Sequence, residues 1–165
     1  MMTSNSSVEL KVIVIDSREK PNVIKPIKDY FDSVGQDYII RGLLVGDYMY
    51  YHNPSYVIDR KHSISELCQN VQSADHQRFK RELEKAKKLG SHLCILVETD
   101  EARTLEDVRE WVNPNRRKSL RSPTGETLYK ALDTIRWRYE VDFEFCKPSE
   151  AGKKIIELLE AHDRE

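Results

Sequence analysis

The sequence lacks three features that would each define a class of protein: a long apolar run, paired cysteines and an excess of one charge. No apolar run approaches the roughly 20 residues that a membrane-spanning helix needs, and no signal peptide is recognisable. We therefore expect no membrane contact and a cytoplasmic location. Cys68, Cys94 and Cys146 are widely spaced and form no CxxC pair, which argues against a zinc site.

The near-neutral net charge excludes a protein that is basic throughout, but it does not exclude nucleic-acid binding. Charged residues make up 33% of the 165 residues, and the formal net charge is −1. A local basic patch is enough to bind nucleic acid. The length is that of one domain, and no internal repeat is visible. We expect residues 1–7 to be a disordered leader and residues 8–165 to be a single domain.

Apolar, strand-like runs alternate with helical patterns along the chain. The expected strands cover residues 10–15, 38–45, 48–51, 56–58, 93–97 and 141–146. The expected helices are one of about ten residues between a linker at Pro21 and Gly35, then 64–71, 75–89, 104–112 capped by Thr104, a long helix after Gly125, and 149–161. This alternation predicts an α/β fold with a central mixed sheet and helices on both faces.

The stretch from residue 46 to residue 67 predicts a β-hairpin that runs into a helix, with the turn at residues 52–55. Because strand side chains alternate between faces, Asp59 and Lys61 share one face and Arg60 points to the other. Asp47, at the start of the opposite strand, can bring a second carboxylate to the first face. Two carboxylates and a lysine at a strand end suit Mg²⁺. The alternative is a surface hairpin with an ordinary exposed ion pair between Asp47 and Lys61.

Other charged residues also leave two interpretations open. Glu19 follows a buried strand that ends in Asp16, where catalytic groups are common, but it could equally pair with Arg18 or Lys20. Glu66 stands three residues after Ser63, which is the spacing of a helix capping box. The loop at 113–125 is the densest basic segment, and it is either a solvated loop or a DNA contact. Its basic residues are Arg116, Arg117, Lys118 and Arg121.

The order of these motifs resembles the signature of the XPF-type nuclease domain, GD…ERK…D, within the PD-(D/E)XK superfamily. The matching residues are 46–47, 59–61 and Glu66. Residues 14–19 are similar to the family's first-strand motif V-D-x-R-E, and Arg78-Phe79 resembles its arginine-plus-apolar pair. Two departures are visible. Asp59 replaces the usual glutamate, and Glu66 lies one position beyond the usual aspartate.

The resemblance implies a restriction-endonuclease-like core and a Mg²⁺-dependent DNA endonuclease, with Mn²⁺ as a substitute ion. The implied substrate is branched, flap or fork DNA in repair or recombination, so the protein would be nucleoid-associated when it acts on DNA. Two forms of assembly stay open, a homodimer and a complex with a partner subunit. The alternatives are a non-catalytic DNA-binding module of the same fold and a junction-resolvase or restriction-like nuclease. The implied metal ligands are Asp47, Asp59 and the Arg60 backbone carbonyl. On this resemblance, Lys61 would orient or activate the water and offset developing charge, and Asp16 and Glu19 would lie at the edge of the metal site. Arg18 and Arg78 would support its carboxylates or contact phosphate, and Glu66 would lie in the surrounding shell.

Overall fold

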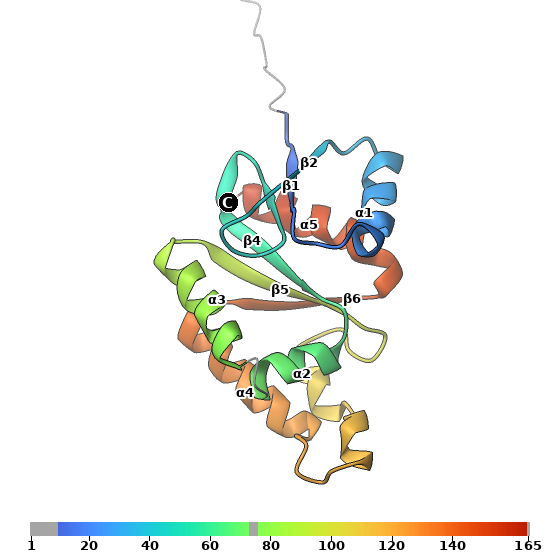
Figure 1. Ribbon diagram of the computed structural model, residues 1–165, viewed down its shortest axis with the longest axis vertical. Helices are drawn as coiled ribbons and strands as arrows, with labels where there is room; N and C mark the ends of the chain where they lie inside the picture. Colours follow the sequence, from blue (N-terminus) through green and yellow to red (C-terminus); the bar gives the residue numbers. More distant parts are fainter. Residues whose placement is uncertain (1–9, 73–75, 165) are drawn as a thin grey trace, which may run out of the picture.

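The computed structural model describes residues 10–72 and 76–164, and it shows a six-stranded mixed sheet with helices on both faces (Figure 1). The strand order is β2-β1-β3-β4-β5-β6. The predicted α/β architecture is therefore confirmed. The expected leader at 1–7 lies outside the described residues. The elements in chain order are β1 (Ile13–Asp16), α1 (Pro21–Ser33), β2 (Tyr38–Arg41), β3 (Tyr48–Tyr50), β4 (Asn53–Lys61), α2 (Ile64–Gln72), α3 (His76–Lys88), β5 (His92–Glu98), η1 (Glu106–Glu110), η2 (Pro114–Arg117), α4 (Gly125–Tyr139), β6 (Asp142–Cys146), η3 (Pro148–Glu150) and α5 (Ala151–Asp163).

The strand directions bring several chain segments to one edge of the sheet. Strands β4, β5 and β6 are parallel, so their carboxyl ends meet at this edge. Strand β3 is antiparallel to both β1 and β4, so β1 ends where β4 ends and β3 begins there. These strand directions therefore bring Asp16, Asp47 and Lys61 to the same edge of the sheet.

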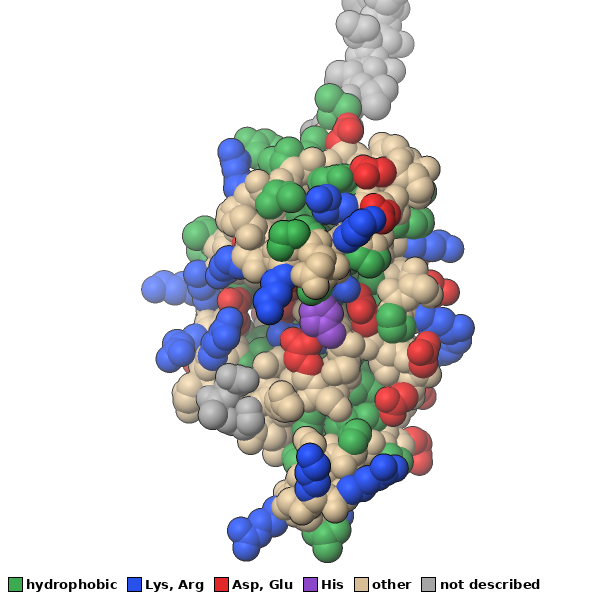
Figure 2. Space-filling model, turned by 45° about the vertical axis from the view of Figure 1, so that its right-hand side comes forward, with side chains coloured by type: hydrophobic (Ala, Val, Ile, Leu, Met, Phe, Trp, Pro, Cys, Tyr) green, Lys and Arg blue, Asp and Glu red, His purple; other side chains and the backbone are tan. Residues whose placement is uncertain are grey.

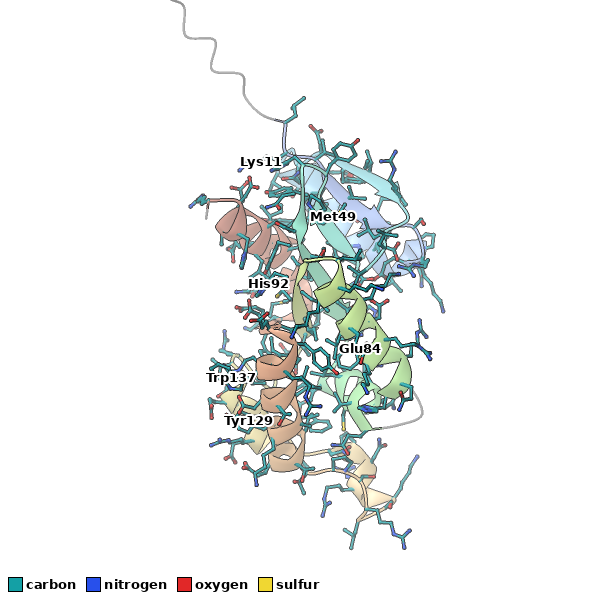
Figure 3. The ribbon with its side chains drawn as sticks, turned by 90° about the vertical axis from the view of Figure 1, so that its left-hand side faces the viewer. Lys11, Met49, Glu84, His92, Tyr129 and Trp137 are labelled. Carbon is teal, nitrogen blue, oxygen red and sulfur yellow. The ribbon has the colours of Figure 1, made fainter. Side chains whose placement is uncertain are left out.

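Two apolar layers cover the sheet. Helices α2, α3 and α4 pack on one face with η1, and their buried residues include Leu67, Leu83 and Leu128. Helices α1 and α5 pack on the other face through residues such as Phe31 and Ile155. Figure 3 shows α3 and α4 side by side. No described helix has both the length and the apolar composition that crossing a membrane requires.

The first half of the chain differs from the sequence prediction at three places. Pro21 begins α1 itself, because its fixed φ suits the first helical position. The strand expected at 38–45 ends at Arg41, and residues 42–47 form a loop. The hairpin turn lies at residues 51–52, and Asn53 already pairs with Tyr50.

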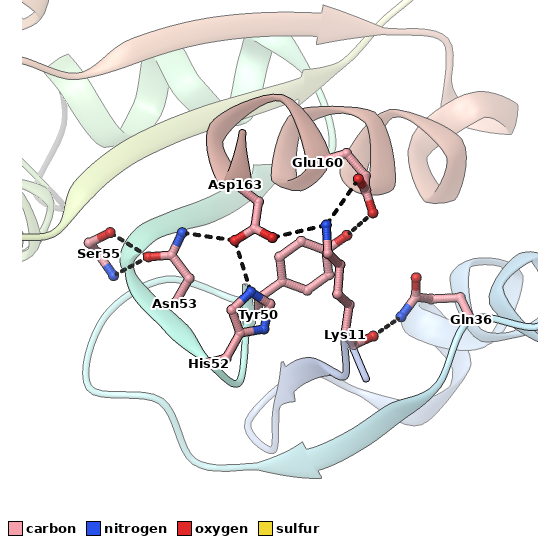
Figure 4. Close-up of polar contacts among 8 residues, drawn as sticks. All are labelled: Lys11, Gln36, Tyr50, His52, Asn53, Ser55, Glu160 and Asp163. Atoms are coloured by element: carbon pink, nitrogen blue, oxygen red, sulfur yellow. Dashed lines mark hydrogen bonds and ion pairs between the residues drawn. The ribbon is translucent and has the colours of Figure 1, made fainter. Parts of the chain in front are cut away.

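Contacts with the end of α5 fix this hairpin turn (Figure 4). The Tyr50 hydroxyl donates to Glu160 Oε1 at 2.8 Å. Asp163 pairs with Lys11 Nζ at 3.0 Å and contacts His52 Nε2 at 2.8 Å. These partners lie over 100 residues away in the chain, so the local turn pattern could not reveal them.

The α-helix expected at 104–112 is a short 3₁₀ helix, η1. Thr104 is not its cap. Instead, Asp107 Oδ2 accepts hydrogen bonds from the backbone N–H groups of Arg103 and Thr104 at 2.9 and 3.1 Å. The turn also packs tightly against α4, since a Cβ on Gly125 would lie 2.5 Å from the Val108 carbonyl oxygen. The start of the helix expected at 75–89 falls partly outside the described residues, and Leu89, expected inward, is exposed.

Gly46 positions the segment that carries Asp47, and its replacement tests the fold around the site. Gly46 has a φ of +73°, and an added Cβ would lie 2.3 Å from Val57 Cγ1 and 3.1 Å from the Ile58 carbonyl oxygen. Gly90 has the same φ of +73° with nothing within 4 Å, so it is a matched control. We predict that Gly90→Ala lowers the free energy of unfolding by about 1 kcal/mol, from backbone strain alone. Gly46→Ala adds a steric penalty of about 1–3 kcal/mol. Urea unfolding measures both, and equal losses would contradict the close approach.

Candidate active site

The shared edge of the sheet opens into a cavity of about 650 Å³. Asp16, Asp59 and Lys61 come to it from strand ends, Asp47 from the loop that leads into β3, and Glu66 from α2. Helix α3 contributes Arg78, Phe79 and Glu82 to the opposite wall. The structure thus brings the acidic residues, the lysine and the two motif arginines Arg18 and Arg78 into one cleft, as the sequence predicted.

Backbone hydrogen bonds from two strands hold Asp47 in place. Its N–H donates to the Ile58 carbonyl at 2.8 Å, and its own carbonyl accepts from the Asp16 N–H at 2.8 Å. Its carboxylate Oδ2 accepts from the Arg60 N–H at 2.8 Å. Both the backbone and the side chain of Asp47 are therefore fixed against β4.

The electrostatic environment of Asp47 is unfavourable for a carboxylate without a cation. Burial raises the pKa of Asp47 well above its ordinary value, and the negative charges of Asp59 and Glu19 raise it further. The hydrogen bond from the Arg60 N–H opposes this shift without cancelling it. A divalent cation between these carboxylates would remove the repulsion.

Lys61 faces the same side as Asp59, as strand alternation predicted. Its Nζ lies 3.1 Å from Asp59 Oδ2, and only 12% and 17% of the two side chains are exposed. Burial acts to lower the pKa of Lys61, but the neighbouring carboxylate of Asp59 outweighs burial and raises the pKa. The ammonium therefore stays charged beside the cleft. The ordinary exposed ion pair between Asp47 and Lys61 is not the arrangement that the structure shows.

Arg60 points to the other face, where it forms a buried ion pair that the sequence analysis missed. Its Nε lies 2.5 Å from Glu98 Oε1, and its Nη1 donates to the Val23 carbonyl at 3.5 Å. This pair ties the end of β4 to the end of β5 and to α1. The only signal in the sequence is a glutamate at the end of an apolar strand.

Asp16 is buried, and both of its carboxylate oxygens accept hydrogen bonds. Oδ1 accepts from the Leu43 N–H at 2.9 Å, and Oδ2 accepts from Arg18 Nε at 2.8 Å. Arg18 also donates to the Leu43 carbonyl at 3.0 Å. Asp16 and Arg18 thus clamp the loop that leads to Asp47, and a direct catalytic role for Asp16 stays a prediction.

The structure gives different answers for Glu66 and Glu19, each of which had two interpretations from the sequence. Glu66 forms the capping box, because its Oε2 accepts from the His62 N–H at 2.7 Å while its own N–H donates to Ser63 Oγ at 3.0 Å. Glu19 lines the cleft, and Arg18 pairs with Asp16 instead. Within the described residues, Glu19 makes no ion pair with Arg18 or Lys20.

The donor set fits an ion that completes its shell with water. Among residues 10–72 and 76–164, no group of three or more His, Cys, Asp or Glu side chains is arranged to hold a metal. Mg²⁺ needs no such cage, because it keeps several waters and uses one or two carboxylates together with substrate phosphates. Asp47 and Asp59 supply those two carboxylates, and the cavity leaves space for water and phosphate.

The basic loop at 113–125 lies at the lower end of the molecule, apart from the cleft (Figure 1). Its base is ordered by buried Asn113, which donates to the Pro123 carbonyl at 2.9 Å and accepts from the Asn115 N–H at 3.0 Å. Arg116 turns inward and donates to the carbonyls of Leu120 and Ser122 at 3.1 and 2.7 Å. Arg117, Lys118 and Arg121 are exposed. Figure 2 shows basic side chains at this lower end of the molecule.

The family model of the ERCC4 domain matches residues 15–159, which include every motif in the cleft. The chain belongs to the ERCC4 domain family. This membership identifies an XPF-type nuclease domain in a family of DNA nucleases. A comparison with curated protein sequences gives no match.

Solved structures show the same fold as this ERCC4 domain. XPF from Aeropyrum pernix matches with a TM-score of 0.66 and 19% sequence identity, over 93% of this chain. The same protein in complex with DNA matches with a TM-score of 0.64 and 17% identity, again over 93% of this chain. This chain spans 66% of the length of each of those chains.

Replacement of Asp47 by asparagine tests the electrostatics of the cleft without using activity. Because the folded pKa of Asp47 is raised, ionisation destabilises the folded state above the ordinary carboxyl pKa. We predict that Asp47→Asn raises the melting temperature at neutral pH, and that this gain shrinks as the pH falls and wild-type Asp47 becomes protonated. Mg²⁺ should raise the melting temperature of the wild type but not of the variant. A less stable variant at neutral pH, or an equal Mg²⁺ response, would contradict the predicted role.

Proposed function

We propose that this chain is a Mg²⁺-dependent endodeoxyribonuclease that hydrolyses phosphodiester bonds in branched DNA such as flaps and forks. The observation that carries the proposal is the pair of clustered carboxylates, Asp47 and Asp59, beside the charged Lys61 in an open cleft. Membership of a DNA nuclease family supports it, and so does the complex of XPF from Aeropyrum pernix with DNA.

Each residue of the cleft has a proposed role in hydrolysis. Asp47, Asp59 and the Arg60 backbone carbonyl would hold Mg²⁺, or Mn²⁺ in its place. The ion would polarise the scissile phosphate and lower the pKa of a bound water. Lys61 would orient the attacking water and offset the negative charge that develops on the phosphate. Glu19 would border the metal site, and Arg78, exposed on α3 across the cleft, would contact phosphate.

The exposed cations of the basic loop are proposed to follow the DNA backbone. Arg117, Lys118 and Arg121 form no ion pair among the described residues, so their charge is available to phosphates. Arg116 is committed to the loop's own carbonyls and has a structural role. We further propose that the chain acts in repair or recombination in the cytoplasm, associated with the nucleoid, as a homodimer or with a partner subunit.

Cleavage by the wild type and by Lys61→Ala tests the proposed chemistry. We expect the wild type to cut flaps and forks with Mg²⁺ and to lose this activity in chelator. Lys61→Ala should lower the single-turnover rate by about 10²–10³, the loss typical of one preorganised charge-stabilising group. Its DNA affinity in Ca²⁺ should change little. Lys130→Ala, exposed on α4, is the control. A wild type that binds but never cuts would favour the non-catalytic module, and a Lys61 effect on affinity alone would make Lys61 a phosphate anchor.

A triple variant of the loop tests its contact with the backbone. Replacing Arg117, Lys118 and Arg121 with glutamine should weaken binding to all DNA shapes and flatten the salt dependence by up to about three units of slope. The single-turnover rate at saturating enzyme should persist, because none of the three lines the cleft. The control is Lys28→Gln with Lys153→Gln, on the α1 and α5 side of the sheet. An unchanged salt slope would remove the loop from the DNA interface.

A further inference from the structure

Leu120 is the most exposed of the large apolar side chains in the described residues, at 80%. It lies at the tip of the basic loop and belongs to neither apolar core. Burying a leucine is favourable by about 1.5–3 kcal/mol, so a partner that covered Leu120 would gain stabilisation from the contact.

Hydrogen bonds order the loop backbone on both sides of Leu120. The Leu120 carbonyl accepts from Arg116 Nη1 at 3.1 Å, which fixes the leucine's backbone from inside the loop. Backbone bonds from Ser119 N–H to the Asn115 carbonyl at 3.0 Å and from Ser122 N–H to the Ser119 carbonyl at 3.2 Å close the turns on either side. A surface that is ordered before binding loses less conformational entropy when it binds.

The charges around Leu120 indicate what it contacts. Arg117, Lys118 and Arg121 are exposed, and Figure 2 shows basic side chains on either side of a hydrophobic one at the lower tip of the molecule. An apolar side chain among unpaired cations suits a ligand with a dense anionic backbone and an accessible apolar face. An intact duplex has the anionic backbone but no accessible apolar face, because each base pair is covered by its neighbours in the stack. A branch point has both, since one base pair ends a stack there.

We propose that Leu120 is a wedge that packs against the terminal base pair at a DNA branch point, while the three cations hold the adjoining phosphates. Leucine is among the side chains that proteins insert against base steps. Helix α2 begins at the catalytic strand, and its Cys68 Sγ lies 4.0 Å from Asn113 Nδ2 at the base of the loop. This link would fix the distance between the branch and the cleft. The proposal rests on the proposed function and adds to it the feature that selects branched DNA.

Leu120→Ala provides the test, with Leu89→Ala as the matched control because Leu89 is also exposed, at the end of α3. We expect Leu120→Ala to weaken binding to forks and flaps in Ca²⁺ by about tenfold and binding to intact duplex by less than about twofold. The salt slope should not change, unlike that of the cation variant. With 2-aminopurine in the branch-point pair, wild-type binding should raise the fluorescence, and Leu120→Ala should not. Cuts by Leu120→Ala should spread over more positions relative to the branch.

Several outcomes would overturn the wedge. Equal loss on fork and duplex would make Leu120 a general contact. A change in sedimentation without a change in fork affinity would make the tip a contact with a second copy of the chain. Unchanged fork affinity, fluorescence and cut positions would remove it altogether. If the wild type cuts forks and Leu120→Ala behaves identically, the proposed role of Leu120 is wrong but the proposed nuclease function stands. If the wild type neither binds nor cuts DNA, the proposed function fails.

Discussion

The Asp47 carboxylate, buried against the end of β4, is the constraint on which the rest of the cleft depends. Its charge is unfavourable there because the group is buried, and the negative charges of Asp59 and Glu19 add to this cost, while the hydrogen bond from the Arg60 N–H partly offsets it. The fold nevertheless holds the group rigidly, with Gly46 in a left-handed conformation against Val57 and with Asp16 clamping the preceding loop. A fold that holds carboxylates close together although their negative charges repel each other is typical of a site that a cation completes.

The alternation of side chains along β4 separates two tasks. Asp59 and Lys61 face the cleft and form a nearly buried pair, so the lysine remains charged where negative charge would develop. Arg60, between them, points to the opposite face and joins β4 to β5 through Glu98. One strand end therefore carries both the residues proposed for the chemistry and the ion pair that anchors them. The base of the basic loop contacts Cys68 in α2, and the exposed cations of this loop are proposed to form a second DNA surface outside the cleft.

The sequence predicted what depends on local periodicity. Alternation placed Asp59 and Lys61 together, and the Ser63–Glu66 spacing predicted a capping box that the structure confirms. What it missed depends on contacts between distant segments. Glu98 meets Arg60 across 38 positions, and Asp16 reaches Leu43 across 27. The sequence pattern of the η1 segment predicts an α-helix. In the structure, the Asp107 carboxylate accepts from the Arg103 N–H, and the segment packs against Gly125 as a short 3₁₀ helix. Patterns within a single sequence do not show which distant segments come into contact.

The central claim is that Asp47 and Asp59 form a cation site, and calorimetric titration of Mg²⁺ tests it most directly. Burial raises the pKa of Asp47, so Mg²⁺ competes with a proton for this carboxylate and binding should release protons. Titrations in two buffers with different ionisation enthalpies would give the proton release per bound ion. The account predicts that release increases as the titrations are repeated at lower pH, over the range in which the protein stays folded, with Asp47→Asn removing both binding and release. Binding without proton release throughout this range, or undiminished binding by Asp47→Asn, would contradict the account.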